Sequence, residues 1–284
     1  MYKFSIITIN LNNVAGLERT IKSVFNQTYK DFEYIIIDGG SKDGSAELIS
    51  SNSNQLTYWI SEPDKGIYQA MNKGIQKASG EYLLFLNSGD FLVNPRVLQR
   101  VYKIGFIQDI VVGNCNVSKN GKIVFHATPP EDISLTAFWG KTIPHQSSFF
   151  RRDLFSKFGM YLENFHIHAD LEFFIRTIIL SNCSYLKIPL IISDYNLDGK
   201  SSSINYRFIS DTEKENIFKT LIPERILFDY NIWDIERKAI EPLVWASNKP
   251  FLNFFVKLIY KIATSIVTLR KKIKVISYAY ITNK

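Results

Sequence analysis

The 284-residue chain has few cysteines and no long apolar run, and both scarcities exclude classes of protein. Two cysteines, Cys115 and Cys183, are too few for a disulfide scaffold or a multi-cysteine zinc site, and they favour a reducing compartment. No stretch approaches the roughly 18 uninterrupted apolar residues that predict a membrane-spanning helix. The first apolar run, residues 4–9, is too short to be the core of a signal peptide. With 46% hydrophobic residues, 14 glycines and 9 prolines, the chain is neither disordered nor collagen-like.

Acidic residues are absent from residues 249–284, and this gap locates the positive charge of the chain. The segment holds eight lysines and arginines, whereas the rest of the chain has 26 basic and 27 acidic residues. The net charge of +7 therefore belongs to one end of the sequence. This distribution disfavours a nucleic-acid partner for the body and predicts an anionic partner for the basic segment.

In the first hundred residues, short runs rich in β-branched residues alternate with segments of helical periodicity. The predicted strands are 4–9, 34–37, 56–60 and 82–86, and the predicted helices are 14–25, a short one ending at 49, and 67–78. Apolar strands separated by helices are typical of an α/β fold with a mostly parallel sheet covered on both faces. Further on, Asn120-Gly121 between the runs 111–117 and 122–126 predicts a tight hairpin.

Acidic, glycine-containing turns follow two of the predicted strands. Asp38-Gly39-Gly40 ends the second run, and Asn87-Ser88-Gly89-Asp90 ends the fourth. Parallel sheets bind ligands at the carboxyl ends of their strands, so we expect Asp38 and Asp90 at one edge, beside a phosphate-bearing ligand and a cation. Alternatively, both aspartates cap the helices that follow them. The sequence has neither a Gly-x-Gly-x-x-Gly fingerprint after the first strand nor a Walker phosphate loop.

Four motifs in order make the sequence similar to a known family of enzymes. They are residues 5–10 (SIITIN), 36–45 (IIDGGSKDGS), 62–74 (EPDKGIYQAMNKG) and 80–90 (GEYLLFLNSGD). Together they resemble the inverting family 2 glycosyltransferases of the GT-A fold, and the last two resemble the subgroup that builds bacterial surface polysaccharides. The resemblance covers roughly residues 4–205.

The resemblance implies a Rossmann-like GT-A fold, a nucleotide-sugar donor, a divalent metal, and transfer with inversion at the anomeric carbon. We expect a GT-A domain over residues 1–205, with a nucleotide-binding half (1–110) and an acceptor half (111–205). Residues 206–284 are expected to form a helical region that ends in an amphipathic, basic tail.

The resemblance also assigns residues to the donor nucleotide. Thr8 and Asn10 match the positions that meet the nucleobase and ribose, and Asp38 matches the acid that hydrogen-bonds the base, usually uracil. The other expected nucleotide-sugar-binding residues are Gly39, Asp64, Lys65, Tyr68, Asn87 and Asp90.

The metal motif departs from the family pattern Asp-x-Asp. The position of its second aspartate is Gly89 here, which leaves Asp90 as the carboxylate of this stretch. One carboxylate, diphosphate oxygens and waters can hold a hard cation. We therefore expect Asp90 to bind Mn²⁺ or Mg²⁺, assisted by Asn87, with weak metal affinity in the absence of the donor.

The acceptor half carries the expected catalytic base. Asp170 begins an aromatic-rich helix and matches the family's base, which removes the proton of the acceptor hydroxyl. A simple helix cap at Asp170, or a metal cluster of His166, His168 and Asp170, is the alternative.

Three further residues are expected at the acceptor or the donor diphosphate. His145 and Gln146 lie in a segment, 143–150, that resembles an acceptor-side motif of the same subgroup. Lys200 lies in a loop where the family often closes a Gly-Ser segment over the donor, although a solvated surface lysine is an equal alternative.

The tail combines dense apolar residues with the basic cluster. Between residues 251 and 269 the polar residues recur every three or four positions, which places them on one narrow stripe of a helix. Such a helix, followed by Arg270-Lys271-Lys272-Ile273-Lys274, suits the surface of an anionic bilayer. The alternative is a helix packed on the catalytic domain or on a second subunit.

These features predict a cytoplasmic glycosyltransferase, peripheral at the inner face of the cytoplasmic membrane. It is expected to move one sugar from a nucleotide diphosphate, by family habit UDP rather than GDP, to a polyprenyl-linked or oligosaccharide acceptor of a surface glycan such as O-antigen or capsule. A homo-oligomer is compatible with the sequence. A catalytically impaired nucleotide-sugar-binding protein, or a membrane adaptor of the same fold, is the alternative.

Overall fold

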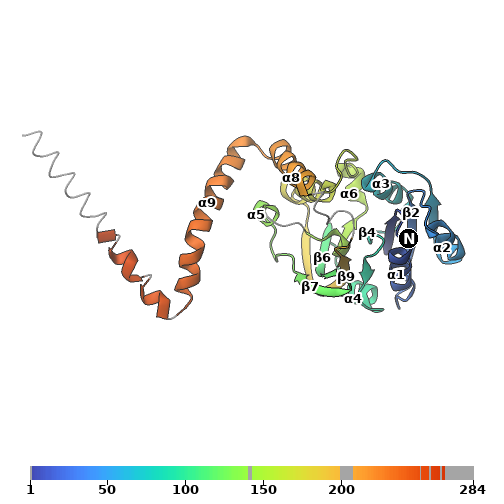
Figure 1. Ribbon diagram of the computed structural model, residues 1–284, viewed down its shortest axis with the longest axis horizontal. Coiled ribbons are helices and arrows are strands. Elements are labelled where there is room, and N and C mark those ends of the chain that lie inside the picture. The colour runs from blue at the N-terminus through green and yellow to red at the C-terminus, as the bar shows by residue number, and fades with distance from the viewer. Residues whose placement is uncertain are drawn as a thin grey trace, which may run out of the picture. The chain divides into compact units, whose positions relative to one another are not determined.

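The computed structural model describes residues 2–139, 143–198, 207–249, 251–255, 257–262 and 264–265 (Figure 1). The chain divides into two compact units, one ending at Leu221 and the other beginning at Ile222. The first unit includes the helix α8 (Arg207–Leu221), which the sequence analysis assigns to the C-terminal region.

Nine strands of the described chain form one mixed sheet in the first unit, in the spatial order β3-β2-β1-β4-β8-β6-β9-β5, with β7 paired to β6. β1 to β4 run parallel to one another, whereas β8 runs antiparallel to both β4 and β6. The strands are β1 (Phe4–Asn10), β2 (Phe32–Asp38), β3 (Tyr58–Ser61), β4 (Tyr82–Phe85), β5 (Phe91–Leu92), β6 (Ile110–Lys119), β7 (Lys122–Ala127), β8 (Ser148–Arg151) and β9 (Tyr185–Asn196).

Helices connect these strands and continue into the second unit (Figure 1). The α-helices are α1 (Val14–Phe25), α2 (Ser45–Ser51), α3 (Ile67–Lys77), α4 (Val97–Ile104), α5 (Leu135–Phe138), α6 (Asp153–Phe158), α7 (Ala169–Phe174), α8 and α9 (Glu224–Ser247). Two 3₁₀ turns, η1 (Ser53–Gln55) and η2 (His145–Ser147), and one π-helical segment, η3 (Ile175–Leu180), complete the described elements.

Helices cover both faces of the central strand β1, which is buried along its whole length. Successive side chains of a strand point to opposite faces of the sheet. Ile6 accordingly packs in one cluster with Leu17 and Ile21 of α1, whereas Ile7 meets α3 at Gly74. A side chain at position 74 would collide with Ile7, so glycine allows α3 to lie close to the sheet. The layered α/β fold predicted from the sequence is confirmed.

The hairpin predicted at Asn120-Gly121 is also confirmed. It joins β6 to β7, and both turn residues have positive φ, 50° at Asn120 and 72° at Gly121. Two successive positive φ angles are what a two-residue hairpin turn requires, and asparagine and glycine tolerate them best. The Asn120 amide donates to the carboxylate of Asp198, which ties the turn to the end of β9.

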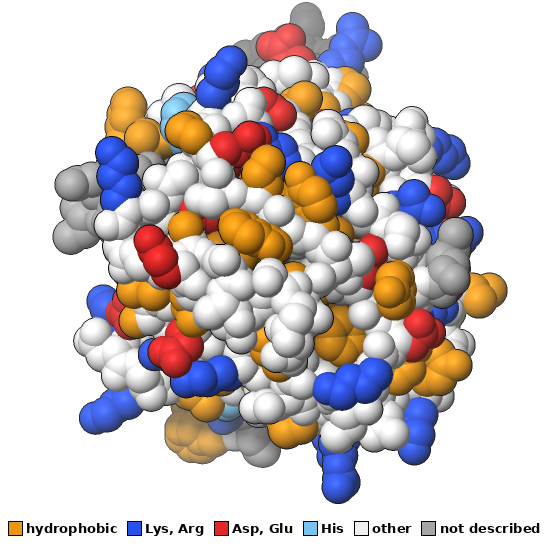
Figure 2. All heavy atoms as spheres, turned by 90° about the vertical axis from the view of Figure 1, so that its right-hand side faces the viewer, with side chains coloured by type: hydrophobic (Ala, Val, Ile, Leu, Met, Phe, Trp, Pro, Cys, Tyr) orange, Lys and Arg blue, Asp and Glu red, His pale blue; other side chains and the backbone are white. Residues whose placement is uncertain are grey.

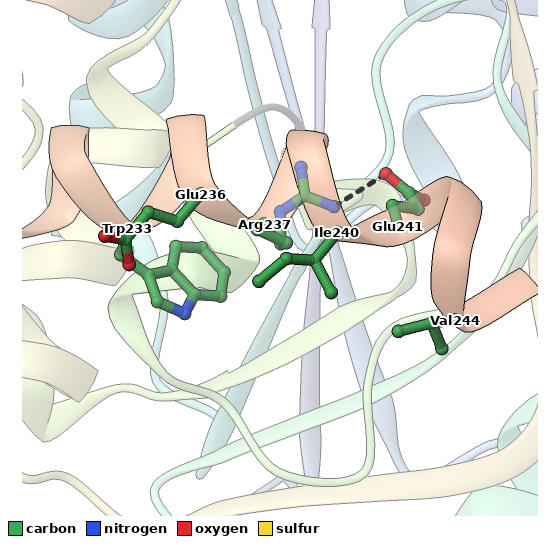
Figure 3. A pocket seen from close by; sticks show the side chains of 6 residues that line it. All are labelled: Trp233, Glu236, Arg237, Ile240, Glu241 and Val244. Carbon is green, nitrogen blue, oxygen red and sulfur yellow. Dashed lines mark hydrogen bonds and ion pairs between the residues drawn. The ribbon is translucent and has the colours of Figure 1, made fainter. Parts of the chain in front are cut away.

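The second unit exposes apolar side chains along α9. Trp233, Ile240 and Val244 lie on one side of the helix, with Arg237 and Glu241 forming an ion pair between them (Figure 3). The described tail residues 251–255 and 257–262 are helical, and Phe251, Phe254 and Tyr260 among them are exposed. None of the described helices is long and apolar enough to cross a bilayer. The predicted basic cluster at 270–274 lies outside the described residues.

On the α2 side of the first unit, basic and acidic side chains are interspersed over the surface (Figure 2). Charge on that face is therefore distributed, in keeping with a body whose basic and acidic residues nearly balance.

Candidate active site

The carboxyl ends of β1, β2 and β3 meet around Asp38. In the strand register, Asp38 stands between Asn10 of β1 and Ser61 of β3. Its fully buried carboxylate accepts four hydrogen bonds, from Asn10 Nδ2 (2.7 Å), Ser41 N (2.9 Å), Ser41 Oγ (2.6 Å) and Ser61 Oγ (2.6 Å). Burial alone raises the pKa of Asp38, but the hydrogen bonds from Ser41, Ser61 and Asn10 outweigh it and hold that pKa below its ordinary value. Asp38 is therefore an ionised anchor that joins three strand ends.

Asp64 lies close to this anchor, on the loop between β3 and α3. Its side chain is 7% exposed, and Lys73 Nζ of α3 lies 2.5 Å from Asp64 Oδ1 and 2.6 Å from Glu62. Asp64 Oδ2 accepts no hydrogen bond from any described residue. A Cβ atom at Gly39 would lie 3.5 Å from this oxygen, an ordinary van der Waals contact, so Gly39 and the Asp64 carboxylate are direct neighbours. The structure thus brings Asp38, Gly39 and Asp64 together and adds Lys73, which the sequence analysis missed.

Three of the residues predicted to bind the nucleotide, Thr8, Tyr68 and Lys65, lie in three different surroundings. Thr8 is fully buried, and its hydroxyl donates to the Leu86 carbonyl and pairs with the Tyr34 hydroxyl, so it links β1 to its neighbours in the sheet. The hydroxyl of Tyr68 donates to the Ile167 carbonyl in the acceptor half. Lys65 is exposed on the loop just before α3. The expectation that Thr8 meets the nucleobase stays a prediction, and in this structure the hydroxyl of Thr8 is engaged within the protein.

Asp90 is buried behind the turn that follows β4. It is 4% exposed, and its Oδ1 accepts a hydrogen bond from the backbone N–H of Asn196 (3.0 Å). Burial raises the pKa of Asp90 to about 7, although the Asn196 N–H, His145 and Gln146 act in the opposite direction; nearby Asp194 adds to the rise. The turn itself is fixed by Thr20, whose Oγ1 donates to the Asp90 carbonyl (2.7 Å). Asp90 therefore changes charge near neutral pH.

The oxygens around this turn fit a hard cation only in part. Asn87 Oδ1 is buried and accepts no hydrogen bond from a described residue, which suits a cation ligand. Among the described residues, no three His, Cys, Asp or Glu side chains are grouped as a metal site. Asp90 with Asn87 would therefore hold a divalent ion only together with oxygens from another molecule, such as a diphosphate.

His145 links this turn to Asp170 across the site. His145 Nδ1 lies 2.9 Å from Asp170 Oδ2, and His145 Nε2 lies 3.3 Å from Asn87 Nδ2. Tyr68 approaches the other oxygen of Asp170 at 3.4 Å. The chain Asn87–His145–Asp170 therefore runs from the end of β4 to the first turn of α7.

Asp170 is a buried carboxylate of the acceptor half whose two oxygens both accept hydrogen bonds. It is 9% exposed, and Oδ1 also accepts the backbone N–H of Leu171 (2.9 Å). Burial raises its pKa, but the hydrogen bond from His145, the charge of the nearby histidines whenever they are protonated, and the Leu171 N–H outweigh burial and lower it below the ordinary value. Asp170 is therefore ionised at neutral pH, the form that accepts a proton.

The loop before α7 is held by α8, a contact that the sequence did not reveal. Glu213 of α8 accepts backbone N–H groups of His166 (2.5 Å), Ile167 (3.0 Å) and His168 (3.1 Å). His168 Nε2 pairs with Ser210 Oγ (2.8 Å). His166 and His168 thus connect this loop to α8. Among the described residues, no group of ligands supports the alternative of a metal cluster with Asp170.

Of the remaining predicted residues, Gln146 is buried beside Asp90, and Lys200 lies outside the described residues. Asn10 is 5% exposed and directs its amide to Asp38.

Comparison with known proteins shows the family to which this chain belongs. Residues 5–159 match the model of Glycosyl transferase family 2. The chain belongs to this family. An uncharacterized glycosyltransferase of Mycobacterium tuberculosis is 37% identical over 212 residues, covering 70% of this chain and 76% of that protein. A PGL/p-HBAD biosynthesis glycosyltransferase of Mycobacterium bovis is 32% identical over 208 residues, covering 70% of this chain and 79% of that protein.

Solved structures of glycosyltransferases share the fold. S. aureus TarS 1-349 in complex with UDP-GlcNAc superposes with a TM-score of 0.57 at 18% identity over 68% of this chain. The mannosyltransferase PcManGT of Pyrobaculum calidifontis, in complex with GDP-Man and Mn²⁺, has a TM-score of 0.58 at 15% identity over 78% of this chain. This chain spans 58% and 64% of those two chains, less than two thirds of either. The GT-A fold predicted for the chain is confirmed, and the chain is a family 2 glycosyltransferase.

Proposed function

We propose that this glycosyltransferase moves one sugar from a nucleotide-diphosphate sugar to an acceptor hydroxyl, with inversion, in a single displacement. The observation that carries the proposal is the chain Asn87–His145–Asp170, which joins the expected diphosphate end of the sheet to an ionised carboxylate. A base for the acceptor and a group beside the leaving diphosphate are the two parts that such a displacement needs.

In the proposed step, Asp170 accepts the proton of the acceptor hydroxyl while that oxygen attacks the anomeric carbon. The new carbon–oxygen bond forms as the bond from the anomeric carbon to the diphosphate breaks, and the electron pair leaves with the nucleoside diphosphate. One carboxylate suffices, because no separate acid has to protonate a sugar leaving group. When bound, a divalent cation supplies positive charge to the departing diphosphate, and Asp90 with Asn87 would hold it.

We assign the nucleotide to the edge formed by Asp38, Gly39 and Asp64, and we propose UDP as the nucleotide. Asp38 matches the family position that hydrogen-bonds uracil, and Asp64 Oδ2 is a buried acceptor that lacks a donor among the described residues. The fold neighbours named for UDP-GlcNAc and GDP-Man support a nucleotide-sugar donor in general, and Mn²⁺ in one of them supports a divalent ion.

We further propose a lipid-linked or oligosaccharide acceptor and a position at the cytoplasmic face of a membrane. The exposed apolar residues of α9 and of the described tail helix support this assignment. The eight basic residues and missing acids of residues 249–284 suit an anionic lipid surface.

A panel of UDP- and GDP-sugars with Mn²⁺ or Mg²⁺, scored by release of free nucleotide, tests the proposal. We expect release from one or a few UDP-sugars, since slow donor hydrolysis by water needs no acceptor. Release from no donor, together with a UDP-induced rise in melting temperature, would instead favour the catalytically impaired binding protein.

A further inference from the structure

The His145 ring occupies a fixed place between two halves of the site. It belongs to the 3₁₀ turn η2, which is held from both sides: Ser147 Oγ pairs with Ser193 Oγ of β9 (2.7 Å), and Ser148 Oγ donates to the Pro144 carbonyl (2.8 Å). The side chain is only 14% exposed, and both ring nitrogens have partners within the protein. The ring is therefore oriented by the fold before any ligand arrives.

The identity of the two partners determines which nitrogen of the neutral ring carries the proton. An ionised carboxylate can only accept, so Nδ1 must donate to Asp170 Oδ2. Nε2 of the neutral ring then offers a lone pair, and the Asn87 amide group at 3.3 Å is a donor that matches it. Asn87 therefore holds His145 in the tautomer that Asp170 needs.

This geometry gives a reason for asparagine at position 87. An ionised aspartate there has no hydrogen to donate, so it could not form a hydrogen bond with the lone pair of Nε2. Asparagine donates Nδ2–H to the ring and leaves Oδ1 buried and without a donor from the described residues. The same side chain can thus orient the ring and present an oxygen to the diphosphate end of the site.

We propose that His145 is a positioning residue for Asp170, held in its Nδ1–H tautomer by Asn87, and not a group that contacts the donor or the acceptor. This inference rests on the proposed function, since it concerns the base of that reaction. The hydrogen bond from His145 to Oδ2 and that from the Leu171 N–H to Oδ1 together restrict rotation of the Asp170 side chain, so that the remaining lone pairs of the carboxylate keep one direction toward the acceptor hydroxyl. Such orientation affects the chemical step and leaves the binding of the donor unchanged.

A double-mutant cycle on the full chain tests the proposal, with the donor identified by the panel above. We expect His145→Ala to lower kcat about 10- to 100-fold and to leave KM for the donor within about twofold. In the Asp170→Asn background, His145→Ala should lower kcat little further, because the carboxylate that His145 orients is already absent. A raised donor KM, or a full additional loss in the double variant, would overturn the proposal and favour a diphosphate or acceptor contact.

Two further measurements separate positioning from folding. His145→Gln keeps an amide donor for Asp170 and should recover part of the lost kcat, whereas His126→Ala, an exposed histidine of β7, should leave kcat unchanged. With four histidines in the chain, ¹⁵N NMR of the imidazole groups can report the tautomer directly. We expect the Nδ1–H form for His145 and a shift toward a tautomer mixture in Asn87→Ala; an Nε2–H form in the wild type would refute the proposal.

The outcome of the donor panel is distinguishable from the outcome of this cycle. If no nucleotide sugar is turned over by the wild type, the proposed function fails and the inference fails with it. If the wild type is active and the cycle is additive, only the role of His145 is overturned.

Discussion

At the scale of single residues, the site uses carboxylates whose surroundings shift their pKa values in opposite directions. Asp38 and Asp170 are buried, yet the hydrogen bonds that they accept keep both pKa values low. Asp90 is also buried, but its hydrogen bonds do not outweigh the effect of burial, and its pKa rises to about 7. The two low-pKa aspartates are thus ready as an anchor and a base, whereas Asp90 gains its charge fully only above neutral pH or beside a cation.

Asp90 should make the unliganded protein less stable as pH rises. A folded-state pKa above the unfolded value of 3.8 means that the folded state holds the proton more tightly, so the stability contribution is complete below about pH 4 and is lost as pH rises toward 7. We expect Asp90→Asn to raise the free energy of unfolding at pH 8 by up to roughly 4 kcal/mol and to change it far less at pH 4. Urea denaturation at the two pH values measures this. An equal effect at both would show that the charge of Asp90 is not the cause.

The same shift predicts competition between protons and a divalent cation. A cation at Asp90 must displace the proton that burial stabilises, so Mn²⁺-dependent binding of UDP should weaken as pH falls from 8 to 6. Calorimetric titration of UDP with and without Mn²⁺ measures the dependence. Binding that needs Mn²⁺ equally at both pH values would place the cation elsewhere.

At the scale of secondary-structure elements, α8 supports the base from a distance. Glu213 accepts three backbone N–H groups of the loop that leads into α7. Because hydrogen bonds to charged groups contribute about 1.5–3 kcal/mol each and are not additive here, we expect Glu213→Ala to lower the free energy of unfolding by about 2–4 kcal/mol. The loop would also hold Asp170 less firmly, so kcat should fall as well.

The same helix offers a matched control. Glu215 is exposed and pairs with Lys219, one turn further along, so Glu215→Ala should leave the free energy of unfolding nearly unchanged. Chemical denaturation of both variants tests the contrast. Equal effects would mean that Glu213 acts through helix stability and not through the loop.

Much of the element order was predictable, because local signals specify it. The apolar β-branched runs marked β1, β2 and β4, and Asn120-Gly121 marked the β6–β7 turn. The direction in which each side chain points was harder to predict. Thr8 lies on a strand buried on both faces, so an alternating pattern gave no information about its direction.

The links across the site were not predictable for a related reason. His145 is separated from Asn87 by 58 residues and from Asp170 by 25, and Glu213 is separated from His166 by 47. No local pattern records such pairs; they follow from antiparallel β8 and from α8 returning to the acceptor half. The resemblance to family 2 named Asp38 with Asn10, and Asp170 with His145, but not the hydrogen bonds that join the members of each pair.

At the scale of the whole molecule, a nearly neutral catalytic unit is joined to an apolar and basic C-terminal segment. We expect removal of residues 249–284 to abolish binding to vesicles that contain anionic lipid, and to leave turnover of the donor with a water-soluble acceptor within about twofold. Co-sedimentation with anionic and with neutral vesicles measures the first effect. Unchanged binding of the truncated chain to anionic vesicles would show that this segment does not dock on lipid. A change in the oligomeric state of the truncated chain would favour the alternative, in which the segment packs between subunits.

The measurement that bears most directly on this account is the comparison of wild type and Asp170→Asn on the donor and acceptor pair found for the enzyme. We expect glycosyl transfer to fall about 100-fold or more, because general base catalysis contributes about 10²–10⁴, while the affinity for UDP with Mn²⁺ stays within about twofold. Transfer at a near-normal rate by Asp170→Asn would contradict the assignment of the base, and with it the reaction assigned to this site.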